Sequence, residues 1–180
     1  RIEGLNEGVD DYITKPFSMD YLKSRVANII RQRRRLQQLW LAGIDGGAGA
    51  DDTAGTTAPG MAEADKDFAD RLLKFIEQRI GDAELKIDDM ARELAVSRTV
   101  LYGKVKTLSG MSPVDFVRHV RITKAEKMVA GTRMTLAEIA YAVGFADPKY
   151  FSRTFKQKTG LTPSEYRKRH ATGDDAQPQA

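Results

Sequence analysis

The sequence of 180 residues is 41% hydrophobic and 30% charged, with a formal net charge of +4 at pH 7. It contains no cysteine, which excludes disulfides, zinc sites with thiolate ligands and cysteine nucleophiles. No apolar run approaches the roughly 20 residues that cross a bilayer, so we expect a soluble chain without membrane contact.

The basic residues are concentrated in the second part of the sequence. Residues 65–170 contain 21 Lys and Arg against 14 Asp and Glu, a net charge of +7, whereas residues 1–64 contain 8 against 9. Such an excess suggests a polyanionic partner, although many solvated surfaces are equally basic. The two histidines, His119 and His170, are far apart and lack clustered carboxylates. No acid, base and nucleophile cluster either, so we expect no metal site, no cofactor and no catalytic residues.

Residues 1–41 are predicted to form a strand followed by a helix. The β-prone run at residues 11–14 precedes Lys-Pro-Phe, and a strand that stops at Lys-Pro is expected there. Ser18 can cap the helix that follows, whose apolar stripe consists of Leu22, Val26, Ile29 and Ile30. The sequence leaves open whether this helix folds alone or docks on the rest of the chain.

The run GVDDYITKPF followed by an amphipathic helix resembles the end of a two-component receiver domain, which has an α/β fold. The resemblance implies that Lys15 binds the phosphoryl group of the acceptor, that Pro16 is a cis proline and that Tyr12 changes rotamer on activation. The acidic pair, the acceptor Asp and the Ser/Thr of such a site would precede Arg1. We therefore expect the sequence to be a piece of a longer protein that carries only a receiver remnant.

Residues 42–64 differ sharply in composition from the helix predicted after them. They are rich in Gly, Ala, Thr and Asp and nearly empty of large apolar groups, which predicts a flexible linker. The next helix is expected to start at Asp65, a possible N-cap, and to end at Gly81. Its apolar stripe consists of Phe68, Leu72, Phe75, Ile76 and Ile80.

An internal repeat covers most of the remaining sequence. The segment that starts at Ile87 aligns with the segment that starts at Leu136, with an offset of 49 residues before a turn and 50 after it. Each copy is predicted to be a short helix, a tight turn and a second helix, with one residue inserted in the second turn. Gly144 offers the positive φ that such a turn often needs. The predicted core positions of the second helices are Leu101, Val105, Leu108, Phe151 and Phe155.

Each second helix is followed by glycine, a hydroxyl residue and proline, in the runs Gly110-Met-Ser-Pro113 and Gly160-Leu-Thr-Pro163. Glycine can form a left-handed cap, the hydroxyl residue can cap the next helix, and proline fits its first position. Thr162 with Glu165 matches a capping box. A long helix from Pro113 to Ala130 is expected to hold the two motifs at a fixed separation, with its apolar side formed by Phe116, Val117, Val120, Met128 and Val129.

Polar residues gather on the opposite face of each second helix. A helix-turn-helix that exposes donors on its second helix has the geometry that enters a DNA major groove. In the first copy this face carries Arg98, Thr99, Gly103 and Lys106, with Tyr102 at its flank. In the second copy it carries Lys149, Ser152, Arg153 and Lys156.

The repeat resembles the DNA-binding domain of AraC-type regulators, an all-α fold of seven helices in which a long helix joins two helix-turn-helix motifs. The second copy carries the pattern of that family in Gly144-Phe145, Tyr150-Phe151, Phe155-Lys156, Gly160, Thr162-Pro163 and Tyr166-Arg167. We expect this domain at residues 65–170 and a disordered tail at residues 171–180. The strand-helix remnant of the α/β receiver completes the expected fold.

The resemblance implies a role for individual residues on the two second helices. Expected to read bases are Arg98, Thr99, Tyr102, Lys149, Tyr150, Ser152 and Arg153. Expected to contact phosphates are Lys104, Lys106 and Lys156. Tyr102 and Tyr150 could instead be aromatics at the edge of the core. Gly103 stands where many relatives have a long polar side chain, which weakens base reading at that position of the first motif.

We therefore expect a sequence-specific transcriptional regulator that binds two adjacent major-groove segments of double-stranded DNA. RNA polymerase is an expected further partner, and a homodimer through the missing receiver is another. The receiver remnant implies control by phosphorylation, either in a response regulator or in a hybrid histidine kinase. A hybrid kinase would be anchored in the inner membrane, with this part in the cytoplasm and the kinase activity elsewhere in the full-length protein.

Two alternatives remain open. An AraC-type regulator usually senses a small ligand through an N-terminal pocket rather than through phosphorylation. Some AraC-type domains accompany DNA-repair methyl transfer, but that chemistry uses a cysteine and this chain has none.

Overall fold

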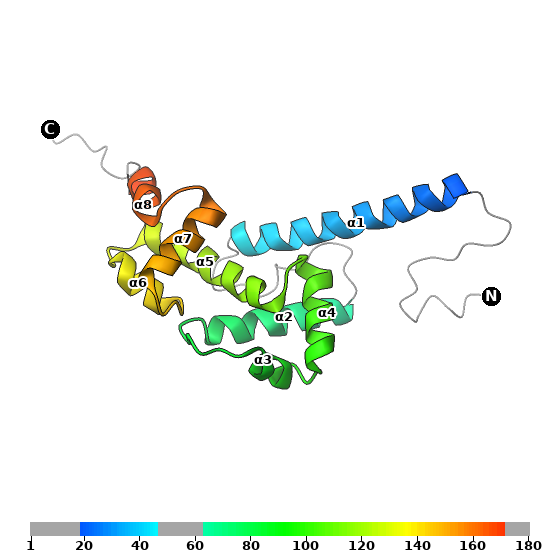
Figure 1. Cartoon of the computed structure of the whole chain (residues 1–180), viewed down its shortest axis with the longest axis horizontal. Helices are drawn as coiled ribbons and strands as arrows, with labels where there is room; N and C mark the ends of the chain where they lie inside the picture. The colour runs from blue at the N-terminus through cyan, green and yellow to red at the C-terminus, as the bar shows by residue number, and fades with distance from the viewer. Residues whose placement is uncertain (1–18, 47–62, 172–180) are drawn as a thin grey trace.

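The computed structural model describes residues 19–46 and 63–171, which form the helices shown in Figure 1. The helices are α1 (Met19–Gly46), α2 (Glu63–Gln78), α3 (Ile87–Glu93), α4 (Arg98–Ser109), α5 (Pro113–Gly131), α6 (Leu136–Ala142), α7 (Pro148–Thr159) and α8 (Pro163–Ala171). The expected all-α fold is confirmed, and α2 to α8 are the seven helices expected for the DNA-binding domain. The predicted strand, with Tyr12, Lys15 and Pro16, lies outside the described residues, as does residue 172 onward.

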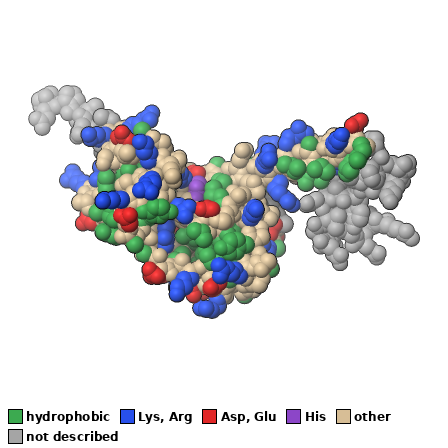
Figure 2. All heavy atoms as spheres, in the orientation of Figure 1, with side chains coloured by type: hydrophobic (Ala, Val, Ile, Leu, Met, Phe, Trp, Pro, Cys, Tyr) green, Lys and Arg blue, Asp and Glu red, His purple; other side chains and the backbone are tan. Residues whose placement is uncertain are grey.

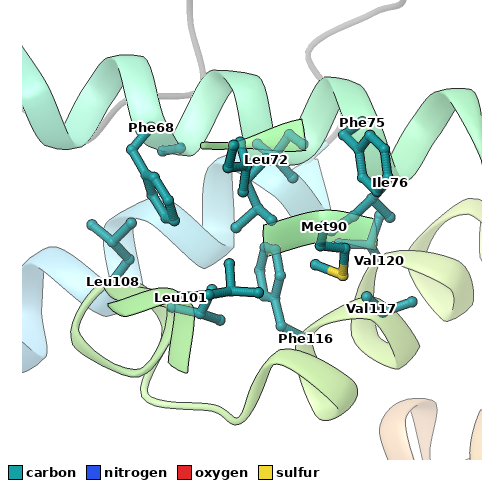
Figure 3. Close-up of a cluster of buried hydrophobic side chains, with 14 of the residues drawn as sticks. Phe68, Leu72, Phe75, Ile76, Met90, Leu101, Leu108, Phe116, Val117 and Val120 are labelled. Carbon is teal, nitrogen blue, oxygen red and sulfur yellow. The ribbon is translucent and has the colours of Figure 1, made fainter. Parts of the chain in front are cut away.

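Two hydrophobic cores lie side by side along the domain. The first joins α2, α3, α4 and the start of α5, and its fully buried side chains include Leu72, Ile76, Met90, Leu101 and Phe116 (Figure 3). The second joins α6, α7 and the later part of α5, with Ile122, Ile139, Phe151 and Phe155 fully buried. Each core therefore supports one helix-turn-helix motif.

Helix α5 connects the two cores, as the sequence predicted. Its N-terminal half contributes Phe116, Val117 and Val120 to the first core, and its C-terminal half contributes Ile122, Ala125 and Val129 to the second. Ser112 caps the helix by accepting a hydrogen bond from the Asp115 N–H, and Pro113 occupies the first turn. A single continuous helix thus fixes the spacing of the two halves.

A half-buried arginine strengthens this connection between the halves. The Arg121 guanidinium of α5 donates to the carbonyl of Asp82 in the first half and to the carbonyl of Gly144 in the second, at 2.5 Å and 2.9 Å. Burial lowers the pKa of Arg121, with Asp82 opposing that shift. Close backbone packing accompanies the contact, since a Cβ added at Gly144 would lie 2.4 Å from the Ile80 carbonyl oxygen.

Helix α1 docks on the first core, which answers the question that the sequence left open. Trp40 is fully buried and stacks on Phe116 with ring centroids 5.1 Å apart, and Ile44 is buried beside it. Such a stacked pair contributes about 0.5 to 1.5 kcal/mol beyond the burial itself. The N-terminal half of α1 projects away from the rest of the domain (Figure 1).

Two expected helix boundaries differ from the structure. Helix α1 continues to Gly46, five residues into the segment expected to be linker, because Trp40 and Ile44 bury one side of its last turns. Helix α2 begins at Glu63 instead of Asp65 and ends at Gln78, before Gly81. The rest of the expected linker, residues 47–62, lies outside the described residues.

Candidate nucleic-acid interface

The two helix-turn-helix motifs have the same dimensions. The first helices, α3 and α6, have 7 residues each, and the second helices, α4 and α7, have 12 each. The first helices start 49 residues apart, at Ile87 and Leu136, and the second helices start 50 residues apart, at Arg98 and Pro148. The predicted insertion of one residue in the second turn is therefore confirmed.

The first turn closes with two backbone hydrogen bonds. The N–H of Val96 donates to the Ala91 carbonyl at 3.0 Å, and the N–H of Ala95 donates to the Arg92 carbonyl at 3.1 Å. This pair of bonds is the Schellman arrangement, which places one residue in the left-handed region. That residue is Ala95, with a φ of 53°.

The second turn repeats this arrangement with glycine at the left-handed position. The N–H of Phe145 donates to the Ala140 carbonyl at 2.9 Å, and the N–H of Gly144 donates to the Tyr141 carbonyl at 3.0 Å. The φ of Gly144 is 82°, which confirms the positive φ expected from the sequence. Both first helices therefore end in the same backbone conformation.

Side-chain caps fix the start of each second helix. Ser97 accepts a hydrogen bond from the Val100 N–H at 3.2 Å and so caps α4. The Asp147 carboxylate accepts from the N–H groups of Lys149 and Tyr150 at 2.9 Å and 3.2 Å and so caps α7. A cap costs about 1 kcal/mol to remove, which makes both N-termini well defined.

The inner faces of α4 and α7 are the ones that the sequence predicted. All five predicted core positions are buried, namely Leu101, Val105, Leu108, Phe151 and Phe155. In the second motif the aromatic rings form a continuous series, since Phe155 lies 5.7 Å from Phe151 and 5.3 Å from Tyr166 between ring centroids. The polar faces must then point outward.

The outward face of α4 carries Arg98, Thr99 and Lys106, all exposed, with Tyr102 half-buried at its flank. The Arg98 guanidinium lies 3.3 Å from an Asp88 carboxylate oxygen on α3 and 5.9 Å from the centre of the Tyr102 ring. Both partners of the ion pair are well exposed, so the pair is weak and can be exchanged for a nucleic-acid group.

The Lys104 side chain turns toward α2 and not toward the outward face, where a phosphate contact was predicted. It is half-buried, and its ammonium lies 3.2 Å from an Asp65 carboxylate oxygen and 5.0 Å from the centre of the Phe68 ring. Both partners belong to α2, so the helix period turns Lys104 toward the scaffold. Lys104 is therefore less available for a phosphate contact than the exposed Lys106.

The outward face of α7 carries Lys149, Arg153 and Lys156, all exposed. Ser152 is half-buried, and its hydroxyl donates to the Pro148 carbonyl at 2.9 Å, which leaves the oxygen free to accept. Tyr150 has features both of an aromatic at the edge of the core and of a residue that could read a base. Its ring packs 5.8 Å from Phe145, yet 42% of the residue remains exposed beside the polar face.

Arg118 is a candidate that sequence reasoning missed. It lies on α5 yet reaches the start of α7, with its guanidinium 6.0 Å from the centre of the Tyr150 ring and 2.7 Å from an Asp115 carboxylate oxygen. Both Arg118 and Tyr150 line a cleft between the two halves, together with Leu85, Val114 and Phe145. The position of Arg118 on a connecting helix gave no signal in the sequence.

Lys and Arg side chains are spread over both halves of the domain in the view of Figure 2, with Asp and Glu side chains interspersed among them. In the same view, apolar side chains line the projecting half of α1. Within residues 19–46 and 63–171, no helix is both long and apolar enough to cross a membrane. The same residues contain no group of three His, Cys, Asp or Glu side chains that could hold a metal ion.

Comparisons with known proteins agree with this geometry. A family model described as a helix-turn-helix domain matches residues 90–169. Over 174 residues, 95% of this chain, the sequence is 29% identical to histidine kinase P4 of Formosa agariphila, and it spans 12% of that kinase.

Two solved structures have the same fold. The C-terminal domain of the two-component response regulator yesN from Fusobacterium nucleatum is 29% identical, with a TM-score of 0.50, and the match covers 53% of this chain and 93% of that one. A transcriptional regulator with an AraC-type DNA-binding domain from Chromobacterium violaceum is 25% identical, with a TM-score of 0.57, and the match covers 62% of this chain and 99% of that one. The two equal motifs and their connecting helix, together with these matches, show that residues 63–171 form an AraC-type helix-turn-helix DNA-binding domain.

Proposed function

We propose that this chain is the output part of a transcriptional regulator that reads two successive major-groove segments of one DNA duplex. The observation that carries the proposal is the pair of equal motifs, each of which exposes polar and basic side chains on a capped second helix. Major grooves on one face of B-DNA recur every helical turn, about 10 base pairs. The operator should therefore contain two short elements with that spacing.

Different residues of α7 are assigned to specificity and to affinity. Lys149 and Arg153 lie in the first and second turns, where side chains of a recognition helix reach base edges, and arginine can bond guanine in a bidentate manner. Lys156 lies in the last turn, where it would meet a phosphate. In the first motif we assign base reading to Arg98 and Thr99, and phosphate contact to Lys106. The exposed Tyr150 and the half-buried Tyr102 and Ser152 would complete the two reading faces.

We further propose two-component control, with a hybrid histidine kinase as the full-length protein. The similarity to histidine kinase P4 supports this, because it covers 95% of the chain and so includes most of the sequence before the DNA-binding domain. That part holds the Lys15-Pro16-Phe17 run, which resembles a receiver end. A ligand-responsive regulator would have a different segment there.

Several further properties of the full-length protein follow as parts of this proposal. Kinase activity would belong to the region before this chain, and the DNA-binding part would lie in the cytoplasm. Phosphorylation of the receiver would promote a homodimer, which raises the effective concentration of the motifs at paired operator sites. Bound at a promoter, the domain would contact RNA polymerase.

Selection from random duplexes with the whole chain, at two salt concentrations, tests the central proposal. We expect two conserved elements about 10 base pairs apart and an affinity that falls steeply with salt, because phosphate contacts release counterions. A selected site with a single element would contradict docking by two motifs. An affinity independent of salt would contradict the phosphate contacts.

A further inference from the structure

The last turn of α1 contacts both halves of the DNA-binding domain through one carboxylate. Asp45 lies 2.8 Å from the Thr123 hydroxyl and 3.0 Å from His119 Nε2, both on α5. The same carboxylate oxygen lies 2.9 Å from the Lys158 ammonium on α7. Asp45 thus joins the end of α1 to the second recognition helix.

Lys158 is held on several sides at this point. Its ammonium also lies 2.9 Å from a Glu126 carboxylate oxygen and donates to the Thr123 hydroxyl. Only 20% of the Lys158 side chain is exposed, and only 22% of Glu126. Charge-assisted hydrogen bonds with this degree of burial are stronger and less screened by salt than exposed ion pairs. We therefore expect the ion pairs of this cluster to hold α1 and α7 together rather than to be replaced by contacts with water.

The same end of α1 also holds the first recognition helix. Trp40 and Ile44 are buried in the core that supports α4. The Gln37 amide donates to the Thr107 carbonyl at 2.8 Å, in the last turn of α4. One helix outside the seven-helix domain therefore contacts α4 and α7, each near its C-terminus.

We propose that Asp45 is a positioning residue that fixes where α7 stands relative to α4. Within the domain, α5 and Arg121 connect the two halves. The end of α1, which lies outside the repeated motifs, adds a second connection between them. Because α1 enters the domain from the preceding part of the chain, any change in how its end docks would alter the spacing of the two recognition helices. The predicted effect on DNA binding rests on the proposed function, whereas the predicted placement of α7 relative to α4 does not.

Distance measurement between spin labels tests the placement without DNA. The chain has no cysteine, so labels at Gly103→Cys on α4 and Gln157→Cys on α7 would be unique. A side chain at Gly103 meets nothing within 4 Å, and Gln157 is exposed. We expect Asp45→Ala to widen or shift the distance distribution between the labels. Asp20→Ala, the same charge change at an exposed position of α1, should leave the distribution unchanged.

Duplexes in which the spacing of the two selected elements is varied test the consequence for DNA. Asp45→Ala should lower the affinity for the best spacing about 10-fold relative to Asp20→Ala and flatten the preference among spacings. Affinity for a duplex with one element should be equal in the two variants, because each motif keeps its own core. Equal spacing preference in both variants, with unchanged label distances, would overturn the proposal.

A second pair of variants covers the case in which Asp45→Ala is poorly folded. Lys158→Gln removes the α7 side of the contact, and Lys124→Gln removes an equal charge from an exposed site on α5. Only Lys158→Gln should change the label distances. If it instead lowered the affinity for one element as much as for two, the cluster would only stabilise the fold, and the positioning role would be wrong. Altered label distances in a chain that selects no DNA would refute the proposed function alone.

Discussion

Ala95 and Gly144 occupy the same position in the two turns, and both have a left-handed backbone, with φ values of 53° and 82°. For a residue with a Cβ this conformation costs roughly 1 to 2 kcal/mol, whereas glycine adopts it freely. The first turn therefore carries strain that the second avoids. Gly144 has an additional reason to lack a side chain, because the first half of the domain packs against it.

Ala95→Gly should stabilise the chain. Relief of the left-handed strain exceeds the entropy that glycine adds to the unfolded state, so we expect an increase of up to about 1 kcal/mol in the free energy of unfolding. Urea denaturation measures it. Ala137→Gly, at an exposed position inside α6, should have the opposite effect and cost about 0.5 to 1 kcal/mol. A loss of stability in both variants would show that Ala95 is not strained.

Gly144→Ala should destabilise the chain by about 2 to 4 kcal/mol, since it adds left-handed strain and overpacking together. The new Cβ would lie 2.4 Å from the Ile80 carbonyl oxygen and 2.8 Å from the Arg121 guanidinium, so the contact between the halves must open. Gly160→Ala provides the matched control, because its φ is 80° but its Cβ would meet nothing within 4 Å. If Gly160→Ala lowered the free energy of unfolding as much as Gly144→Ala, left-handed backbone strain alone would account for the loss of stability.

Gly103→Lys should strengthen DNA binding. Gly103 lies on the outward face of α4 between Thr99 and Lys106, and a side chain there enters open space. One added phosphate contact increases the slope of log affinity against log salt by about 0.9. Gly131→Lys adds the same charge at the end of α5, in equally open space, and should change the slope less. Equal slopes for the two variants would place Gly103 away from the DNA.

Arg153→Ala and Lys156→Ala should weaken DNA binding in different ways. Loss of a base contact costs about 1 to 3 kcal/mol on the selected site and relaxes one base position, as we expect for Arg153. Loss of a phosphate contact weakens all sequences alike, as we expect for Lys156. Repeated selection with each variant distinguishes the two, with Lys124→Ala as a control for charge. A uniform loss in both variants would contradict base reading by Arg153.

Much of the fold was predictable, because the two copies of the repeat gave two sequence patterns for each helix of the motif. The inserted residue, the glycine C-caps and the buried positions of α4 and α7 all follow from local periodicity and turn chemistry. The direction of Lys104 did not follow, because only the three-dimensional packing of α2 shows that Asp65 and Phe68 face it.

Docking of α1 could not be predicted for a similar reason. The spacing of Leu36, Trp40 and Ile44 indicates an apolar side of the helix, but it does not identify the surface that covers it. The contacts of Asp45 span 78 residues to Thr123 and 113 to Lys158, and no local pattern connects such distant positions. Gly and Asp residues near the end of α1 instead favoured a linker.

Docking of α1 should weaken in acid. Burial raises the pKa of Asp45, but hydrogen bonds from His119, Lys158 and Thr123 outweigh burial and hold this pKa below its ordinary value. A carboxyl whose pKa is lower in the folded state stabilises that state above its unfolded pKa, about 3.9, and loses this contribution as the pH falls further. Glu126 is the other acidic group at the cluster, through its contact with Lys158.

The single tryptophan of the chain reports this change, because Trp40 is fully buried only while α1 is docked. We expect its emission to shift to longer wavelength as the pH falls below about 4. In Asp45→Asn the emission should be shifted already at neutral pH and should depend less on acid. Glu165→Gln is the control, since hydrogen bonds from Thr162 lower the pKa of Glu165 in the second half, away from α1. An acid titration of Trp40 emission that is identical in Asp45→Asn and the wild type would show that Asp45 does not hold α1 in place.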